Sequence, residues 1–354
     1  MRKKMKTNAS TLSASKAGST VSSTGSSFVP ASVSSSVAQG EQALRKRLLS
    51  GHRNTLARAI TLIENEAPGA LEVMRAIFGH PGRAMVVGVT GAPGVGKSTL
   101  VSAYIGELRR RGHRVAVIAV DPSSPVSGGA ILGDRVRMGA HAGDEGVFVR
   151  SLSSRGHSGG LTRMTARVVD VMDAAGMDVI VLETVGIGQL EIEVADIAHT
   201  KVVVMAPGMG DEIQAIKAGI LEIADVLVVN KGDNPLAMQT AQQLRDALAL
   251  TPQSGWRPPV LVTTAPEGLG VPEMADAVEA HARETSPREG SRTPRERMRK
   301  LLGAAVARQA RERVAALKGA DFDALCDALL RGDVDFSTAA GEVLAGLGGA
   351  ETEE

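Results

Sequence analysis

Gly91-Ala92-Pro93-Gly94-Val95-Gly96-Lys97-Ser98 is the stretch of this sequence that says most about its architecture. It matches the phosphate-binding pattern G-x-x-x-x-G-K-[ST] at every fixed position. The apolar run 84–90 before it is typical of a buried strand, and residues 98–101 after it open a helix. The glycines let successive backbone N–H groups point toward an anion at the helix N-terminus. We therefore expect Gly91 to Thr99 to hold phosphates, with Lys97 on the terminal phosphates and Ser98 on Mg²⁺.

A second motif, Asn230-Lys231-Gly232-Asp233, follows the apolar run 226–229. It matches N-K-x-D, the pattern that reads guanine in GTPases. Its carboxylate can accept two hydrogen bonds from guanine, whereas adenine offers no such pair of donors on that edge. The same four residues are also good turn formers. Because they follow a strand downstream of a phosphate loop, we predict a GTP-binding protein rather than an ATPase.

Asp121 and Asp134 are candidate Mg²⁺ ligands. Asp121 follows an apolar run and opens the sequence Asp-Pro-Ser-Ser-Pro. A carboxylate at that strand end can meet an ion held by Ser98, although aspartate before proline is also common turn chemistry. Asp134 lies in the polar, glycine-rich stretch 127–135, where a switch loop is expected. It could join the same metal shell.

Glu183 ends another apolar run, 178–182, and begins Glu-Thr-Val-Gly. Small GTPases usually have Asp-x-x-Gly at this place, and Glu183 lies three residues before Gly186 with one more methylene. A purely structural glutamate is not expected here, because burying its charge unpaired is expensive. We expect Glu183 to organise the metal or the attacking water.

The stretch 207–217 follows one more predicted strand and contains Asp211 and Lys217. Glycines before Asp211, then a helix that includes Lys217, describe a movable loop close to the nucleotide. The spacing fits equally well an Asp211 that caps the helix and a solvated Lys217. The residues alone leave both interpretations open.

Composition excludes several classes of function. The 354 residues carry 40 Lys and Arg against 39 Asp and Glu, so no net field attracts nucleic acid. No basic stripe with interleaved aromatic residues appears either. Cys326 is the single cysteine, which excludes an internal disulfide and a cysteine metal cluster, and we expect it to be buried in the core. No apolar segment reaches the roughly 18 residues that span a bilayer, so we predict a soluble, cytoplasmic protein.

Residues 1–40 differ from the rest of the chain. Ser, Thr, Ala and Gly dominate there, and no acidic residue precedes Glu41. We expect a disordered N-terminus, because such a segment cannot bury enough apolar surface to fold. A basic, Ser-rich, acid-free start also fits an organellar transit peptide, which would place the protein in the mitochondrial matrix.

The remaining patterns predict an α/β fold with terminal helical extensions. Apolar residues at helical spacing, interrupted at Pro68-Gly69, predict two N-terminal helices over 41–80. Apolar strands alternating with amphipathic segments predict a P-loop domain over 81–285, a mostly parallel sheet with helices on both faces. Ligands gather at the C-terminal ends of such strands, where every motif above lies. The predicted strands after the first are 115–120, 147–152, 179–182, 201–205, 226–229 and 260–263.

The C-terminal part, 286–354, begins with a Pro-, Ser- and Gly-containing linker. Helical patterns follow at about 295–317, 322–330 and 339–347, and no strand remains for them to cover. These helices could pack on a second copy of the chain or cap their own domain, and patterning does not separate the two.

From about Glu41 to Leu317 the sequence closely resembles the MeaB/ArgK-type P-loop GTPases, chaperones of adenosylcobalamin-dependent acyl-CoA mutases that are sometimes labelled transport-system kinases. The N-terminal 40 residues lie outside the resemblance. It is carried by long strings: GVTGAPGVGKSTL from residue 88, IAVDPSSPVSGGAILGDRVRM from 118, SRGHSGGL from 154, ETVGIGQLEIEVAD from 183, APGMGDEIQAIKAGILEIAD from 206 and NKGD from 230.

The resemblance implies a signal-recognition-type P-loop domain whose C-terminal arm forms a homodimer. It implies GTP or GDP on the phosphate loop and guanine reading by Asn230, Lys231 and Asp233. Thr264-Ala265-Pro266 looks like the last base-contacting loop, although Thr replaces the more usual Ser. The implied Mg²⁺ environment is Ser98, Asp121, Asp134 and Glu183. Asp211 and Lys217 would lie in an extra switch that signals to the mutase.

The implied role is to couple GTP hydrolysis to loading and protection of the cobalamin of a mutase, most often methylmalonyl-CoA mutase. The chain has no Asp-x-His-x-x-Gly pattern, so the mutase is expected to hold the cobalamin. Three alternatives are a nickel-insertion GTPase, a kinase of a transport-system binding protein and a binding module without turnover. Seven scattered histidines and one cysteine argue against the first, and the Mg²⁺ carboxylates against the third.

Overall fold

The computed structural model describes residues 31–80, 83–121, 139–141, 143–153, 160–184, 197–208, 223–250, 255–285, 294–317 and 320–349. The chain divides into two compact units, Met1–Gly40 and Glu41–Glu354. Of the first unit, only residues 31–40 are described, and they are helical. The sheet and the candidate site belong to the second unit.

The described residues form one seven-stranded sheet whose paired strands all run parallel, in the order β3-β2-β4-β1-β5-β6-β7. The central strand β1 lies between β4 and β5, and Val89 is in register with Glu183 of β4. Val and Ile dominate the strands, as expected where helices cover both faces. The strands are β1 (Met85–Thr90), β2 (Val115–Asp121), β3 (Val147–Ser153), β4 (Val179–Thr184), β5 (Thr200–Met205), β6 (Val226–Val229) and β7 (Val260–Val262).

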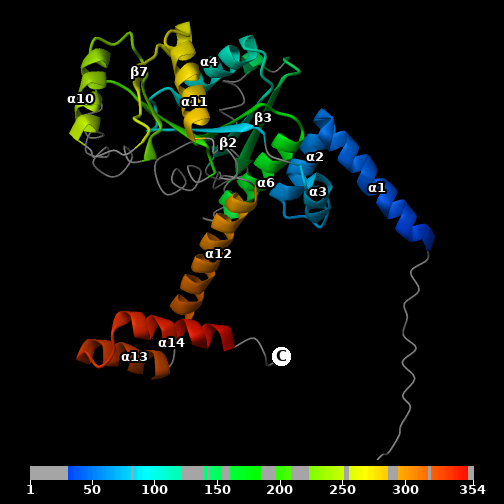
Figure 1. Ribbon diagram of the computed structural model, residues 1–354, viewed down its shortest axis with the longest axis vertical. Helices are drawn as coiled ribbons and strands as arrows, with labels where there is room; N and C mark the ends of the chain where they lie inside the picture. The colour runs from blue at the N-terminus through cyan, green and yellow to red at the C-terminus, as the bar shows by residue number, and fades with distance from the viewer. Residues whose placement is uncertain are drawn as a thin grey trace, which may run out of the picture. The chain divides into compact units, whose positions relative to one another are not determined.

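Alternate strand residues feed cores on the two faces of the sheet. Val87 and Val89 of β1 pack with α4 (Lys97–Arg110) and α11 (Val271–Thr285). Val86 packs with α2 (Arg53–Glu64), α3 (Gly69–Ile77) and α6 (Gly160–Ala174). Figure 1 shows α4 and α11 together on one side of the strands, with α2, α3 and α6 on the other. A third core joins α10 (Ala237–Leu250) to β5, β6 and β7. The sheet is therefore buried on both faces, and its strand ends are left for ligands.

Within residues 31–80, which the structure describes, three helices precede the sheet, whereas two were predicted over 41–80. They are α1 (Ala31–Leu49), α2 (Arg53–Glu64) and α3 (Gly69–Ile77). The unpredicted break falls after α1, where the side chain of His52 caps α2 by accepting a hydrogen bond from the backbone N–H of Thr55. The helix α1 also begins at Ala31, inside the segment 1–40 that was predicted to be disordered. Residues 1–30 lie outside the described part of the chain.

The described part of the chain after residue 293 forms three helices, close to the predicted bounds: α12 (Pro294–Ala316), α13 (Ala320–Arg331) and α14 (Phe336–Gly349). The linker residues 286–293 lie outside the described ranges. Cys326 of α13 is exposed, so its predicted burial is wrong. It sits on a short helix that packs on α14, so much of its surface faces solvent rather than a core.

The predicted fold class is confirmed: this is a P-loop α/β domain with a parallel sheet and helical extensions before and after it. Its assignment to the signal-recognition type stays a prediction. All six strands predicted after the first appear within two residues of their predicted bounds. Within the described ranges, no helix is both long and apolar enough to cross a bilayer.

Replacing Ile180 by alanine tests the central core. Ile180 of β4 is fully buried between β1 and β2 on the face covered by α2, α3 and α6. Removing its three carbons leaves a cavity, so we expect a loss of about 2–5 kcal/mol in the free energy of unfolding. The matched control is Leu71→Ala on α3, where the side chain is 59% exposed, with a change within about 0.5 kcal/mol. Urea denaturation followed by circular dichroism measures both, and equal midpoints for the two variants would contradict the assignment of the core.

Candidate functional site

The phosphate loop joins β1 to α4 and is built from glycines that no other residue can replace. Gly91 has φ of 143°, and a Cβ there would lie 2.0 Å from the carbonyl oxygen of Val204 on β5. Gly96, the residue before α4, has φ of 93°, and its Cβ would lie 2.4 Å from Nδ2 of Asn230. Contacts below 3.0 Å do not occur at real Cβ atoms. Backbone conformation and close packing therefore both require glycine at these two positions.

Lys97 is the first residue of α4 and is only 7% exposed. Its Nζ donates hydrogen bonds to the carbonyl oxygens of Gly91 (2.6 Å) and Ala92 (2.9 Å). The ammonium is thus folded back over the loop that the motif assigns to phosphates. The N-terminus of α4 adds its own partial positive charge at the same place, so both features favour an anion here.

Ser98 and Glu183 meet beside the loop. The hydroxyl of Ser98 donates to Oε1 of Glu183 over 2.6 Å, and both side chains are buried, with Glu183 at 0% exposure. Glu183 reaches this position because β4 lies between β1 and β2, in register with Val89 and Ala119. Next to it, Thr184 donates to the hydroxyl of Thr90 over 3.3 Å. The motifs identified Ser98 and Glu183 as candidate Mg²⁺ ligands, but their spacing in the sequence did not predict that the two side chains are in contact.

This pair of oxygens fits a magnesium ion in its chemistry. A serine hydroxyl and a carboxylate are hard oxygen donors of the kind that Mg²⁺ takes beside nucleotide phosphates. Asp121, the last residue of β2, ends the strand next to β4 at the same edge of the sheet. The fourth predicted ligand, Asp134, lies outside the described residues.

Asn230 joins three loops through one side chain. Its Nδ2 donates to the carbonyl oxygen of Val95 in the phosphate loop over 2.9 Å. Its Oδ1 accepts hydrogen bonds from the Thr263 hydroxyl (3.1 Å) and the Ala265 backbone N–H (3.2 Å) after β7. The side chain is 2% exposed, so these partners replace water. The first residue of the N-K-x-D motif therefore positions the loops rather than facing solvent.

The two charged residues of the N-K-x-D motif are open to solvent. Lys231 and Asp233 are exposed, and Lys231 has φ of 59° in the tight turn. A Cβ on Gly232 between them would approach Oγ1 of Thr264 to 2.9 Å, so the two loops lie against each other. Thr264-Ala265-Pro266, expected to be the last base-contacting loop, does adjoin N-K-x-D. The Asp233 side chain is therefore exposed beside the loop that contains Thr264, where a guanine base is predicted to bind.

Sequence reasoning missed how the chain after the predicted switch loop is attached to α4. His141 Nε2 lies 2.9 Å from the carbonyl oxygen of Ser102 and 3.3 Å from its hydroxyl. Arg109 donates two hydrogen bonds, of 2.8 and 2.9 Å, to the carboxylate of Asp144. The Arg109 hydrogen bonds, helped by the backbone N–H of Gly146, hold the pKa of Asp144 below its usual range. Only helical spacing on α4 hinted at a shared face, and no motif marks it.

Asp211 and Lys217 lie outside the described residues, so their predicted role in an extra switch stays a prediction. Thr99 follows Ser98 on α4 and is exposed. The structure thus brings together the phosphate loop, Lys97, Ser98, Glu183 and Asn230 at one edge of the sheet, with Asp233 and Thr264 on the loops beside them.

Comparison with known proteins gives a consistent result. The sequence profile of the family described as "Methylmalonyl Co-A mutase-associated GTPase MeaB" matches residues 56–324. A Pyrococcus abyssi protein named as a GTPase is 42% identical over 323 residues, covering 88% of this chain and 98% of the relative. The Escherichia coli protein named "GTPase ArgK" is 41% identical and covers 66% of this chain and 73% of its own length. The mouse "Methylmalonic aciduria type A homolog, mitochondrial" is 37% identical, over 65% of this chain and 60% of its own length.

Among solved structures, the crystal structure of a protein named "LAO/AO transport system kinase" is similar over 87% of this chain and 98% of its own. The TM-score is 0.65 and the sequence identity 29%.

Asn230→Ala tests the joining of the three loops. The change leaves the Val95 carbonyl, the Thr263 hydroxyl and the Ala265 N–H without their partner, and each buried polar group left unpaired costs about 1–3 kcal/mol. We expect the affinity for GDP, measured by calorimetry, to fall by at least about 100-fold, a loss of roughly 2.7 kcal/mol. Asn234→Ala is the control, because its carboxamide only accepts a bond from Leu236 within its own turn. A GDP affinity in the Asn230 variant equal to that of the control would overturn the joining role.

Proposed function

The chain belongs to the MeaB family of methylmalonyl-CoA mutase-associated GTPases, and we propose that it couples GTP hydrolysis to cobalamin loading and protection of an acyl-CoA mutase. Membership makes it a GTP-hydrolysing P-loop enzyme that binds guanine nucleotides. The observation that carries the proposal is the family match over residues 56–324, which spans the phosphate loop and N-K-x-D. Similarity to the mouse methylmalonic aciduria homolog favours methylmalonyl-CoA mutase as the partner.

In this proposal the nucleotide lies along the carboxyl edge of β1, β4, β6 and β7. Backbone N–H groups of residues 91–99, except Pro93, surround its phosphates, and Lys97 moves its ammonium from the loop carbonyls to the terminal phosphates. Asp233 accepts the two guanine donors, and Asn230 holds the loops at the correct spacing. Lys231 and the loop Thr264-Ala265-Pro266 border the base.

Ser98, Asp121, Asp134 and Glu183 would hold Mg²⁺, which would neutralise charge on the phosphate oxygens. Glu183 has a second task in the proposal. Its carboxylate, buried and held by the Ser98 hydroxyl, orients the attacking water from a fixed position. A carboxylate fixed before the reaction begins needs no reorganisation as charge develops, and this lowers the barrier.

We assign signalling to Asp211 and Lys217, and dimerisation to the C-terminal arm, residues 286–354. Glycines at 208 and 210 allow the loop to move at little steric cost, and a differential contact between nucleotide states is what can shift it. The arm exposes large apolar side chains, which a second copy would cover. They include Leu302 (64% exposed), Val306 (57%), Leu330 (86%) and Phe336 (81%).

Two alternative functions are a kinase of a transport-system binding protein and a metal-insertion GTPase. The similar solved structure is that of a protein named as a transport-system kinase, which favours a kinase as the second candidate. A metal-insertion GTPase is less well supported, because the described parts of the chain hold no group of three or more His, Cys, Asp or Glu side chains that could bind a metal ion.

Lys97→Ala and Glu183→Gln test the hydrolytic roles. Lys97→Ala removes the positive charge from the terminal phosphates, and we expect the hydrolysis rate to fall by at least about 100-fold. Glu183→Gln keeps the shape but loses the charge that orients water and metal, so we expect a fall of about tenfold or more in kcat. Phosphate release measures both, and circular dichroism confirms folding. A hydrolysis rate that stays at the wild-type value in either variant removes that residue from the mechanism.

Asp233→Asn tests guanine reading. The carboxamide offers one acceptor and two donors in place of a carboxylate, so one guanine donor loses its partner while xanthine gains one. We expect GTP to bind at least about tenfold more tightly than ATP in the wild type, and xanthosine triphosphate to gain relative affinity in the variant. Calorimetry with the three nucleotides measures this. The neighbouring Asn234→Ala leaves the order of affinities unchanged if the assignment is correct.

The proposed function is tested by turnover with purified mutases. We expect methylmalonyl-CoA mutase, with or without cobalamin, to bind this protein and to accelerate its slow intrinsic hydrolysis. Asp211→Ala and Lys217→Ala should keep intrinsic turnover within a few-fold of wild type and lose most of the stimulation. A panel of acyl-CoA mutases that neither bind nor alter turnover would refute the chaperone function and favour the kinase. Persistent stimulation with collapsed intrinsic turnover would make the two residues catalytic instead.

A further inference from the structure

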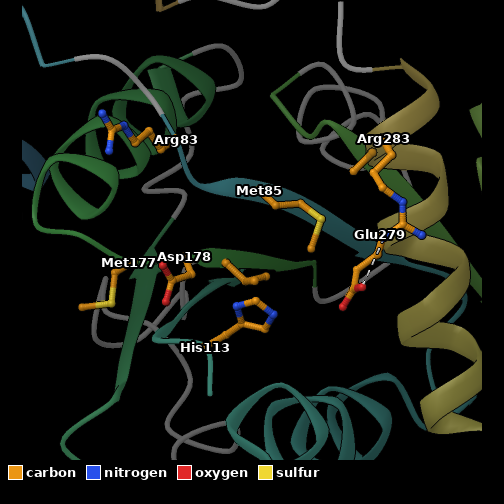
Figure 2. Close-up of a pocket in the computed structure, with 9 residues that line it drawn as sticks. Arg83, Met85, His113, Met177, Asp178, Glu279 and Arg283 are labelled. Atoms are coloured by element: carbon orange, nitrogen blue, oxygen red, sulfur yellow. Dashed lines mark ion pairs between the residues drawn. The ribbon is translucent and has the colours of Figure 1, made fainter. Parts of the chain in front are cut away.

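A second cavity lies at the amino ends of β1 and β4, away from the phosphate loop. Its volume is about 600 Å³, within the range of about 300–1,000 Å³ that is usual for small-molecule sites. It is lined by Arg83, Met85, His113, Met177, Asp178, Val179, Glu279, Ala282 and Arg283. Figure 2 shows the His113 ring and the Met85 thioether pointing into the same space, with Glu279 and Arg283 of α11 on one side.

This cavity is separate from the nucleotide site. Met85 and Val179 are the first residues of β1 and β4, whereas the phosphate loop and Glu183 lie at the far ends of these strands. Parallel strands of this length hold their two ends about 17–20 Å apart. None of the residues assigned to GTP, GDP or Mg²⁺ lines the cavity, so a ligand there leaves the nucleotide in place.

Both carboxylates of the cavity already have hydrogen-bond donors. Asp178 accepts a 2.7 Å bond from the backbone N–H of Arg114. Glu279 accepts a 2.9 Å bond from the guanidinium of Arg111, which lies outside the cavity lining. The negative charge of Glu279 is therefore paired with Arg111 behind the cavity wall, and a cationic ligand would compete with that partner.

The guanidinium and imidazole groups of the cavity have fewer hydrogen-bond partners. Arg283 reaches Glu279 only at 3.7 Å, and its side chain is 71% exposed. The His113 ring borders the cavity from the turn after α4. In Figure 2 the guanidinium of Arg83 points away from Met85 and His113, and we assign it no contact with a ligand. Arg283 and His113 are thus the donors available to an incoming anion.

The remaining lining is apolar and adaptable. Met85, Met177, Val179 and Ala282 form it, and Met177 and Val179 are nearly buried, at 5% and 1% exposure. Unbranched methionine side chains adjust to irregular apolar groups, and so they suit a short aliphatic body without fixing its shape. A ligand that matches this lining has one charged end and one apolar end.

We propose that this cavity binds a small organic anion, a carboxylate or a phosphate on a short aliphatic chain. The anionic group pairs with Arg283 and His113, and the aliphatic chain lies against Met85 and Met177. The carboxylate and phosphate forms share this recognition, and the experiment separates them.

The test uses the full chain with saturating GDP and methyl-¹³C-methionine labelling. Met85 and Met177 are identified among the 13 methionines by Met85→Leu and Met177→Leu. The probes are hexanoate, hexyl phosphate and, as a cation with the same body, hexylamine. We expect one or both anions to shift these two methyl signals in a saturable way, while hexylammonium does not. The anion that saturates at the lower concentration identifies the head group.

Arg283→Gln and His113→Gln should each lower the affinity for the saturating anion by about fivefold or more. The first removes a charge-assisted donor, and the second removes the ring donor. Arg75→Gln, an exposed arginine on α3 outside the cavity, is the matched control and should bind as the wild type does. Equal shifts with hexylammonium, no saturable shift with either anion, or an equal loss in the control would overturn the proposal. GTP hydrolysis by the mutase-stimulated enzyme is measured separately, so a failed chaperone function leaves this test unaffected.

Discussion

The three hydrogen bonds of Asn230 are the interaction on which the rest of the site depends. A parallel sheet brings its loops to one edge, but that alone does not set their spacing. Asn230 does so, because one carboxamide offers donors to the phosphate loop and an acceptor to the loop after β7. Its Nδ2 also fills the space where a Cβ on Gly96 would lie, so the loop can pass only as glycine. The phosphate and base sites are therefore two parts of one packed unit.

Much of the fold could be predicted from the sequence, because buried parallel strands leave a plain signal. Most strands contain a run of Val, Ile or Leu, and polar or glycine-containing turns bound that run in the sequence. The N-terminal helices were harder. A helical pattern of apolar residues shows which face is buried but not where a solvent-exposed turn interrupts the helix. The cap at His52 is a hydrogen bond between its side chain and the backbone N–H of Thr55, and the spacing of apolar residues does not predict it. The exposure of Cys326 likewise depends on which helices surround it, and amino-acid composition does not predict that arrangement.

The candidate site divides in the same way. Lys97, Ser98 and the N-K-x-D residues could be proposed as site residues because phosphate and guanine chemistry demand those residue types at fixed spacing. The contact between Ser98 and Glu183 could not, since it depends on β4 lying beside β1, a neighbour relation between strands far apart in the sequence. The attachment of His141 to Ser102 and of Asp144 to Arg109 is of the same kind. Motifs identify chemistry, whereas strand order decides which chemistries meet.

The two ends of the strands also explain why one sheet can carry two sites of different chemistry. The carboxyl ends of β1 and β4 hold the glycine loop and a buried glutamate, where helix α4 begins and favours anions through its N-terminus. The amino ends of the same strands meet the carboxyl-terminal turn of α4, whose partial negative charge disfavours an anion, so any selectivity for anions there must come from side chains. Arg283 and His113 supply it from α11 and from the turn after α4. A phosphate site built on backbone tolerates few substitutions, whereas one built on side chains can change its ligand by single substitutions without disturbing the sheet.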